Sequence, residues 1–234
     1  MICPSNDAAA RISRYFPSAR VQIVPHEEIG IPMRQSCSSR PRLTRRIAIL
    51  GAFGAHKGLN LINSTVEFVS QRKLPLAFYL IGYSGHQSCH KGIYSETGPY
   101  DESDLPELID SLDPDVILFP AQCPETYCYA LSMAIKTGRP IIVTDIGALP
   151  ERVINLQQAH IIPWNIKGAE LADFLLKVPL NHYSKETESI TITKSGRSRF
   201  EADEIGENHL TVPRINKFYG AEYLSPLSIG TLLP

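Results

Sequence analysis

Three segments that join an apolar run to a helical pattern carry the residue types that could do chemistry. The first, residues 51–58, contains Gly51, Gly54 and Lys57. Glycines let the backbone approach a ligand closely, and a helix N-terminus adds N–H donors and the positive end of its dipole. Together with the charge of Lys57, these features suit a phosphate. An ordinary strand-to-helix turn with a surface lysine is the alternative interpretation, since the spacing fits no standard phosphate-binding fingerprint.

The second segment, residues 119–127, places Glu125 between a short apolar run and a helix that we expect to begin near Glu125 itself. One interpretation is that Glu125 caps this helix, because acidic residues suit the first helical turn. The other is that its carboxylate accepts hydrogen bonds from sugar hydroxyls. The backbone amides of Thr126, Tyr127 and Cys128 would then face phosphate or sugar oxygens. A carboxylate repels a diphosphate, so Glu125 suits the sugar better.

The third segment, residues 144–151, follows another apolar run. Asp145 and Gly147 fit a tight turn, and Pro150 suits the start of the next helix. Turn chemistry alone explains these residues. We therefore expect this segment to support a site and not to react.

Other clusters of reactive side chains are weaker. His86, Cys89 and His90 could bind zinc, but the sequence offers no fourth ligand or paired motif, so we predict no metal site. Cys123 and Cys128 lack the spacing of metal ligands and are interpreted as reduced structural thiols.

The composition narrows the class of protein. The chain has 234 residues, 43% of them hydrophobic, and a formal net charge of -1, so we expect no nucleic-acid partner. Its five cysteines are odd in number and scattered, which favours a reducing compartment. No apolar run reaches the roughly 18–20 residues that span a bilayer, and residues 1–14 do not read as a secretory signal. These features predict a cytoplasmic protein.

The pattern of the central part of the chain alternates short apolar strands with helices. We expect strands at residues 47–51, 76–82, 93–98, 116–119, 141–144 and 160–162. We expect helices at residues 57–72, 101–112, 126–136, 148–155 and 167–176. Strands that are apolar throughout and separated by helices predict a parallel sheet covered on both faces, a Rossmann-like doubly wound α/β domain. The carboxyl ends of all its strands meet at one edge, where ligands bind.

Three zones follow from this reading: residues 1–40, 41–178 and 179–234. The first contains a helix at residues 8–16, capped by Ser5, Asn6 or Asp7, then a strand at residues 20–24 and a linker. The last zone is a weakly patterned tail. In that tail Tyr219 and Tyr223 are better explained as packing residues than as ligands.

An ordered set of segments resembles the family 4 retaining glycosyltransferases, which have the GT-B fold. The closest group is that of bacterial surface-polysaccharide enzymes of the O-antigen and rhamnan type. The resemblance covers residues 45–178. It rests on residues 51–58, 81–84, 97–100, 114–116, 124–134, 137–140, 144–152 and 163–165.

The resemblance implies that the central domain is the C-terminal, donor-binding half of such an enzyme. Lys57 would bind the donor diphosphate, and Glu125, the catalytic residue, would contact the donor sugar. The loops at Gly82–Tyr83 and Gly98–Tyr100 would flank the base. The implied donor-binding set is Gly51, Gly54, Lys57, Gly82, Tyr83, Tyr100, Glu125, Thr126, Tyr127 and Cys128.

The implied reaction transfers a sugar from a nucleotide sugar, with retention, to a glycan or lipid-linked acceptor. It needs no metal or other cofactor, because lysine and helix dipoles stabilise the leaving diphosphate. Enzymes of this kind work in the cytoplasm, in some cases at the inner face of the cytoplasmic membrane. A nucleotide-dependent dehydrogenase or epimerase is disfavoured, because the first turn lacks the glycine spacing and the acidic ribose ligand.

Three features depart from the family pattern. Met133 stands where the family has a second glutamate that grips the donor ribose, and Ala52 stands where it often has an arginine. The third departure is length. Residues 1–24 look like the end of the first GT-B domain and residues 25–40 like the interdomain linker, so we expect the acceptor-binding half to be absent. The alternative to an enzyme is therefore a truncated or non-catalytic module that acts only with a separate N-terminal GT-B domain.

Overall fold

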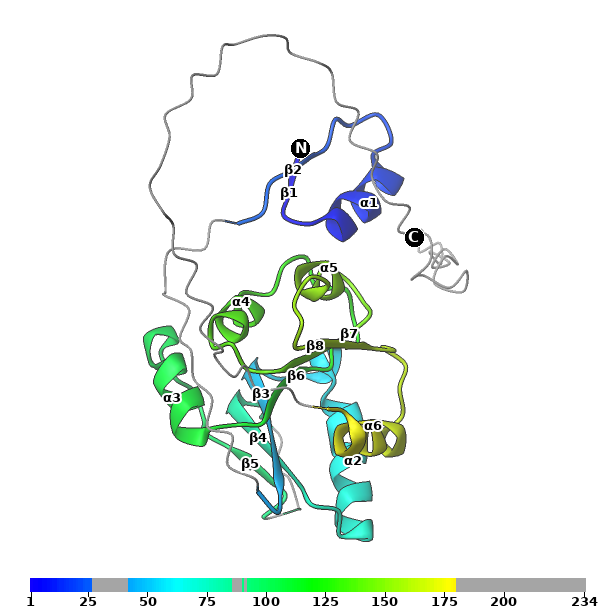
Figure 1. Cartoon of the computed structure of the whole chain (residues 1–234). Helices are drawn as coiled ribbons and strands as arrows, with labels where there is room; N and C mark the ends of the chain where they lie inside the picture. The colour runs from blue at the N-terminus through cyan, green and yellow to red at the C-terminus, as the bar shows by residue number, and fades with distance from the viewer. Residues whose placement is uncertain (27–41, 86–89, 91, 180–234) are drawn as a thin grey trace, which may run out of the picture. The chain divides into compact units, whose positions relative to one another are not determined.

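The computed structural model describes residues 1–26, 42–85, 90 and 92–179. Six parallel strands form a single sheet in the order β5-β4-β3-β6-β7-β8 (Figure 1). The strands are β3 Arg45–Ala52, β4 Leu76–Tyr83, β5 Tyr94–Glu96, β6 Val116–Phe119, β7 Ile141–Thr144 and β8 Ala159–Ile162. The first strand of the sheet, β3, lies in its middle, and the order of the chain reverses between β3 and β6. We call this place the strand reversal. In doubly wound sheets ligands bind there.

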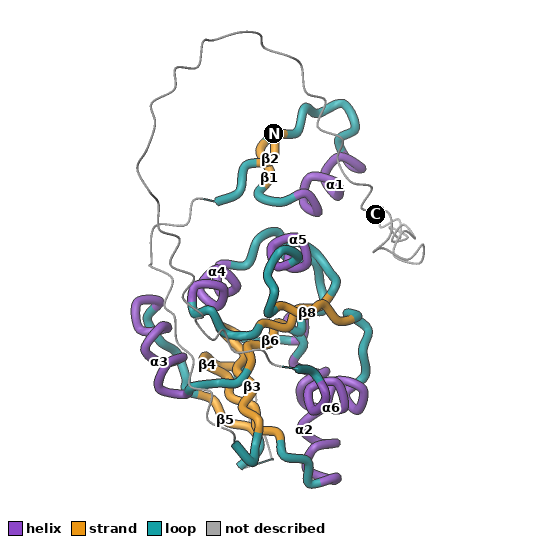
Figure 2. The backbone as a smooth tube through the Cα atoms, viewed as in Figure 1, coloured by secondary structure: helices purple, strands orange, loops and turns teal. Residues whose placement is uncertain are grey.

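In the part of the chain that the structure describes, helices follow every strand of this sheet except β4, and they cover both of its faces (Figure 2). They are the 3-10 turns η1 Ala55–Lys57 and η2 Glu102–Asp104, and the α-helices α2 Leu59–Arg72, α3 Leu105–Leu112, α4 Tyr129–Lys136, α5 Leu149–Val153 and α6 Gly168–Lys177. Each predicted strand and helix of the central domain is present. The strands at residues 116–119 and 141–144 have the predicted bounds, which is typical of short, fully buried runs.

The alternation of side chains along β3 explains the two-sided core. Ile47 and Ile49 belong to a buried cluster with residues of α2 and α6, whereas Ala48 and Leu50 belong to a second cluster with residues of α3, α4 and α5. Successive side chains of a strand point to opposite faces of the sheet, so a strand that is apolar at every position must be covered on both sides. The predicted Rossmann-like doubly wound α/β fold is confirmed.

The N-terminal residues form β1 Ile2–Cys3, α1 Asn6–Tyr15 and β2 Gln22–Ile23, with β1 and β2 paired in parallel in a separate two-stranded sheet. Ser5 is the cap of α1, because its side-chain oxygen accepts a hydrogen bond from the amide of Ala8 at 3.2 Å. The buried apolar side chains of these elements are Cys3, Ala8 and Ala9. Ile2, Tyr15 and Phe16 are exposed.

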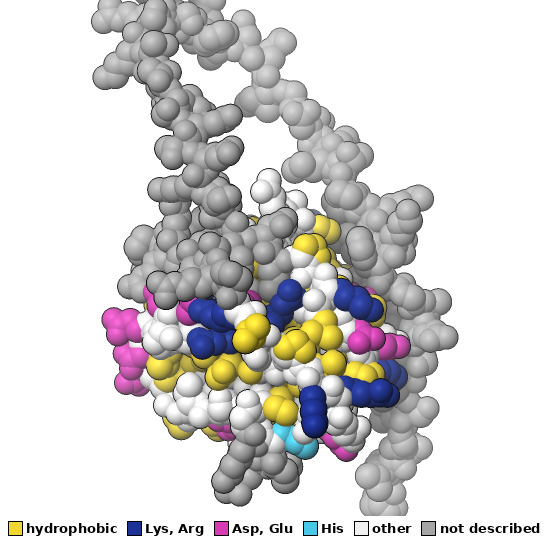
Figure 3. Space-filling model, turned by 60° about the horizontal axis from the view of Figure 1, so that its bottom comes forward, with side chains coloured by type: hydrophobic (Ala, Val, Ile, Leu, Met, Phe, Trp, Pro, Cys, Tyr) yellow, Lys and Arg dark blue, Asp and Glu magenta, His cyan; other side chains and the backbone are white. Residues whose placement is uncertain are grey.

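Contacts group residues Met1–Lys185 as one compact unit and Glu186–Pro234 as another. The second unit lies outside the described residues, and so do Tyr219 and Tyr223 of the expected tail. Within the described residues no helix is long and apolar enough to cross a membrane. The face of the molecule in Figure 3 carries basic and acidic side chains together with hydrophobic ones.

The loop after β3 touches the loop after β6 through Gly58, which joins η1 to α2. Gly58 has a φ of 102°, a left-handed conformation that other residues rarely adopt. A β-carbon at this position would overlap the carbonyl oxygen of Pro120. The close contact of the two loops therefore requires a glycine here.

We expect Gly58→Ala to lower the free energy of unfolding by roughly 2–4 kcal/mol, because it adds a backbone collision to an unfavourable φ. Gly98→Ala is the matched control. Gly98 also has a positive φ, of 88°, but has open space around it, so its cost should be only about 1–2 kcal/mol. Urea unfolding of both variants measures the difference. Equal losses would contradict a tight contact between Gly58 and Pro120.

Candidate functional site

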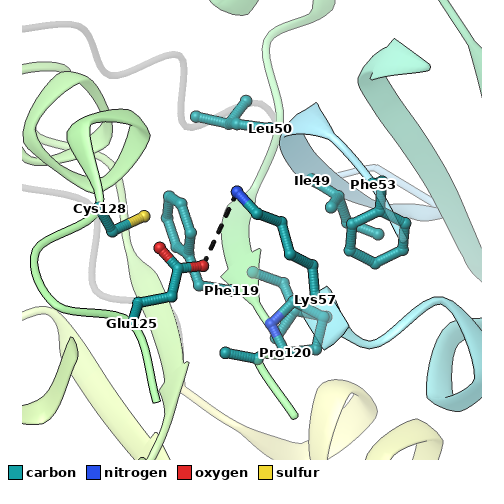
Figure 4. Close-up of a pocket in the computed structure, with 10 residues that line it drawn as sticks. Ile49, Leu50, Phe53, Lys57, Phe119, Pro120, Glu125 and Cys128 are labelled. Atoms are coloured by element: carbon teal, nitrogen blue, oxygen red, sulfur yellow. Dashed lines mark ion pairs between the residues drawn. The ribbon is translucent and has the colours of Figure 1, made fainter. Parts of the chain in front are cut away.

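A pocket opens at the strand reversal, between the carboxyl ends of β3 and β6 (Figure 4). Its floor is apolar, and its polar side chains come from the two loops that follow these strands. The lining residues are Ile49, Leu50, Phe53, Lys57, Leu118, Phe119, Pro120, Ala121, Glu125 and Cys128. Three of the ten predicted donor-binding residues, Lys57, Glu125 and Cys128, therefore line one pocket.

Lys57 and Glu125 form an ion pair across this pocket. The Lys57 Nζ lies 3.8 Å from the Glu125 Oε1, and Figure 4 shows the two side chains pointing toward each other from opposite loops. The lysine side chain is 31% exposed and the carboxylate 18%, so both remain within reach of solvent. An accessible pair at this distance contributes little to stability. The structure thus places a cation and a carboxylate together at the edge where a doubly wound sheet binds ligands.

Backbone contacts hold the loops of Lys57 and Glu125 together. The amide of Gln122 donates to the carbonyl of His56 at 2.9 Å, which joins the loop after β6 to η1. The side-chain amide of Gln122 also donates to the carbonyl of Trp164 at 2.8 Å, after β8. The relative positions of Lys57 and Glu125 are therefore set by main-chain geometry and not only by their own charges.

The third segment predicted from the sequence supports the backbone of Glu125. The amide of Ala148 donates to the carbonyl of Glu125 at 2.8 Å. Gly147, with a φ of 68°, lies so close that a β-carbon there would overlap the Glu125 backbone. The Thr144 hydroxyl donates to the carbonyl of Ala121 at 2.9 Å. The turn after β7 thus buttresses the loop that carries Glu125.

The prediction that a helix begins near Glu125 was wrong. Helix α4 begins at Tyr129, and its N-cap residue is Cys128, whose side chain makes no capping bond. The φ of 75° at Cys128 turns the backbone away from a helical path, so the preceding residues form a loop. Glu125 therefore does not cap the helix, and its carboxylate is directed into the pocket instead.

Cys128 lies beside the Glu125 carboxylate, as Figure 4 shows. Burial, the negative charge of Glu125 and the hydrogen bond that the thiol donates to this carboxylate raise the pKa of Cys128 to about 12. The positive charge of Lys57 acts in the opposite direction but more weakly. Cys128 is therefore a protonated hydrogen-bond donor near neutral pH, and the prediction of a reduced thiol agrees with its free state.

The other predicted site residues lie at neighbouring strand ends or in loops and do not line the pocket. Gly51 and Gly54 flank the end of β3, and Gly82 and Tyr83 end β4. The amide of Gly98 donates to the carbonyl of Gly82 at 2.9 Å, so the loop after β5 is joined to the end of β4.

The two tyrosines of these loops differ in exposure. Tyr83 is half exposed, whereas Tyr100 packs against the second core cluster and burial raises its pKa. Thr126 and Tyr127 lie in the loop between Glu125 and α4, and the ring of Tyr127 is buried. Met133, on α4, is half buried against the same cluster as Tyr100.

Sequence reasoning gave no role to Arg152 on α5, although its guanidinium contacts the loop of Glu125. It donates to the carbonyls of Tyr127 and Cys128, at 2.9 and 2.6 Å. Nothing in the local sequence signals this contact, because its partners are distant in the chain and most are main-chain atoms.

The zinc hypothesis falls mostly outside the described residues, since only His90 of its three residues is described. Among the residues that the structure describes, no group of three or more histidine, cysteine, aspartate or glutamate side chains could hold a metal ion.

Comparison with solved structures finds the same fold in several glycosyltransferases of the GT-B type. Sucrose-phosphate synthase from Thermosynechococcus elongatus matches with a TM-score of 0.56 and 16% sequence identity, over 75% of this chain and 49% of the synthase. HepE from Anabaena, solved in complex with UDP-glucose, matches with a TM-score of 0.55 and 15% identity, over 75% and 52%. WaaG, a glycosyltransferase involved in lipopolysaccharide biosynthesis, matches with a TM-score of 0.58 and 13% identity, over 75% and 53%.

These similarities establish the fold: an α/β domain with a parallel sheet, of the kind found in GT-B glycosyltransferases. The chain spans about half the length of these three structures. No protein-family model and no curated protein matches the sequence.

The raised pKa of Cys128 predicts a poorly reactive thiol. The thiolate is the nucleophile, so alkylation by iodoacetamide at pH 8 should be at least about a hundredfold slower than for a free cysteine. Glu125→Gln removes the charge that disfavours the thiolate. The pKa of Cys128 should then fall, and its alkylation should become several-fold faster. Peptide mass spectrometry measures this rate, and Cys123 in the same loop is the internal control. An unchanged Cys128 rate in Glu125→Gln would refute the contact.

Proposed function

We propose that this chain is the donor-binding portion of a glycosyltransferase that takes its sugar from a nucleotide sugar. The observation that carries the proposal is the pairing of Lys57 with Glu125, 3.8 Å apart, in a pocket at the strand reversal. A nucleotide sugar presents a diphosphate directly joined to a hydroxyl-bearing ring. The cation can bind the diphosphate, and the carboxylate beside it can bind the hydroxyl groups of the ring.

Lys57 is assigned to the diphosphate. Glycosyl transfer releases a nucleoside diphosphate, so negative charge grows on the leaving phosphate as the bond to the sugar breaks. A fixed positive charge at that point stabilises the transition state more than the bound donor. Lys57 is 31% exposed, and its Nζ pairs with the Glu125 carboxylate at 3.8 Å. A diphosphate can therefore replace Glu125 as its partner at low cost.

Glu125 is assigned to the sugar. Its carboxylate accepts hydrogen bonds only, which suits ring hydroxyls and not phosphate oxygens. The backbone amides of Thr126, Tyr127 and Cys128 are assigned to sugar and phosphate oxygens. Met133 cannot accept the ribose hydroxyl bonds that a glutamate would accept, so the loops at Tyr83 and Tyr100 carry the recognition of the nucleoside in this proposal.

The structural neighbours support a nucleotide sugar as the class of donor. HepE has been solved with UDP-glucose, with UDP and glucose, and with UDP alone. The name of WaaG links it to lipopolysaccharide biosynthesis. With the resemblance of residues 45–178 to family 4 enzymes, they support transfer with retention to a glycan or lipid-linked acceptor in surface-polysaccharide synthesis.

A second candidate function is a non-catalytic module that works only with a partner domain. Two observations favour it. The first is that Met133 occupies the expected position of the ribose ligand. The second is that the N-terminal elements expose the large side chains of Ile2, Tyr15 and Phe16, whereas their buried apolar side chains are small. This module would associate with a separate N-terminal GT-B domain and would not turn over a donor alone. Weak or absent donor binding together with tight binding of such a domain would favour it over the enzyme.

We expect UDP to bind with a dissociation constant between about 1 µM and 1 mM, and Lys57→Met to weaken binding about tenfold by removing the charge at the phosphate. Isothermal titration calorimetry measures both values, with GDP and TDP tested alongside. Lys177→Met is the control, since Lys177 is an exposed lysine at the end of α6. Its affinity should equal that of the unmodified protein.

Two results would overturn the proposal. The first is the absence of heat with all three diphosphates at millimolar concentration. The second is equal weakening by Lys57→Met and Lys177→Met, which would mean that the diphosphate responds to overall charge and not to the pocket.

A further inference from the structure

The loop between Glu125 and α4 has a backbone that needs external support. Cys128 has a φ of 75°, a conformation that is unfavourable for a residue with a side chain. Such a conformation persists only where surrounding contacts impose it. Because Cys128 lies three residues after Glu125, its conformation helps to set the direction in which the Glu125 carboxylate points.

Arg152 supplies contacts on both sides of this strained residue. Its Nη1 donates to the carbonyl of Tyr127 at 2.9 Å and to the carbonyl of Cys128 at 2.6 Å. Its Nη2 donates to the hydroxyl of Ser132, one turn into α4, at 2.6 Å. The guanidinium carbon also lies 4.0 Å from the centre of the Tyr127 ring. One planar group thus fixes the last two residues of the loop and the first turns of the helix.

We propose that Arg152 is a positioning residue, whose guanidinium holds the backbone at Tyr127 and Cys128 so that the Glu125 carboxylate faces Lys57. This inference rests on the proposed function for its catalytic meaning, although the contacts themselves do not. Lysine could not replace Arg152, because a single ammonium group lacks the flat fork that reaches both carbonyls and the hydroxyl and covers the ring.

The turn that precedes Arg152 acts in the same direction. Ala148 donates to the carbonyl of Glu125, and Gly147 touches the Glu125 backbone, while Arg152 follows on the short helix α5. The segment after β7 therefore grips the loop at Glu125 and again at Cys128. A substitution of Arg152 should remove the contacts at Cys128 and leave those of Gly147 and Ala148 with Glu125 in place. The loop would then be less ordered while the sheet stays folded.

The half-buried thiol of Cys128 reports on this loop. In Arg152→Met, iodoacetamide should alkylate Cys128 at least about tenfold faster than in the unmodified protein, since local opening exposes the thiol. Hydrogen exchange of the β3 amides should stay the same. Arg72→Met is the matched control: Arg72 also lies over an aromatic ring, that of Phe68, but on α2. It should change neither readout.

Ser132→Ala keeps the arginine and removes one of its acceptors, so it tests the same contact should Arg152→Met fail to fold. Its Cys128 alkylation should rise about two- to fivefold. Two results overturn the positioning role: unchanged Cys128 alkylation in the folded variants, or alkylation that rises only in parallel with β3 exchange. The second would mean that Arg152 stabilises the fold as a whole.

Nucleotide affinity separates this inference from the proposed function. Where the unmodified protein binds UDP, Arg152→Met and Arg152→Lys should each weaken binding about tenfold, with Arg72→Met unchanged. Unchanged UDP affinity in a variant with a released loop would overturn the link between Arg152 and the donor site. If the unmodified protein binds no diphosphate, the proposed function fails, and the alkylation rates still decide whether Arg152 holds the loop.

Discussion

The direct contact between the loops that follow β3 and β6 is the constraint on which the candidate site depends. These two strands are neighbours in the sheet but are separated in the chain by β4, β5 and their helices. The contact is made of backbone: Gly58 lies against the carbonyl of Pro120, and Gln122 donates to His56. Because main-chain atoms meet here, the loops have little freedom to separate, and the side chains of Lys57 and Glu125 are brought within 3.8 Å.

The rest of the domain positions these two loops. The sheet is apolar on both faces, so α2 and α6 cover one face and α3, α4 and α5 the other. This arrangement leaves the carboxyl edge of the strands as the place where polar loops can gather. The turn after β7 then fixes the loop of Glu125 through Gly147, Ala148 and Arg152. The loops after β3, β6 and β7, which the sequence identified as separate segments, therefore contact one another. The loop after β7 supports the one that carries Glu125.

The chemistry of the pocket depends on the charges of two side chains and the protonation state of a third. Lys57 brings the positive charge and Glu125 the negative one, and the thiol of Cys128 stays protonated because the carboxylate and burial disfavour its ionised form. Cys128 can therefore donate to Glu125 and limit the directions in which that carboxylate turns. A ligand that brings a phosphate and hydroxyl groups together would satisfy both charged groups, which is the reason for proposing a nucleotide sugar as the donor.

The sequence by itself determined the elements and their order. Short apolar runs separated by helical patterns can bury their side chains only as strands of a covered parallel sheet, so β6 and β7 could be placed to the residue, and the edge that carries Lys57 and Glu125 followed from topology. Only the tertiary structure decided where α4 begins, that Cys128 has a positive φ, and that Arg152 supports the loop. Residues 124–128 have a good local pattern for a helical start, but Arg152 binds the carbonyls of Tyr127 and Cys128 from another part of the chain. Contacts of a side chain with distant main-chain atoms leave no local pattern, and here they outweigh the propensity of the segment itself.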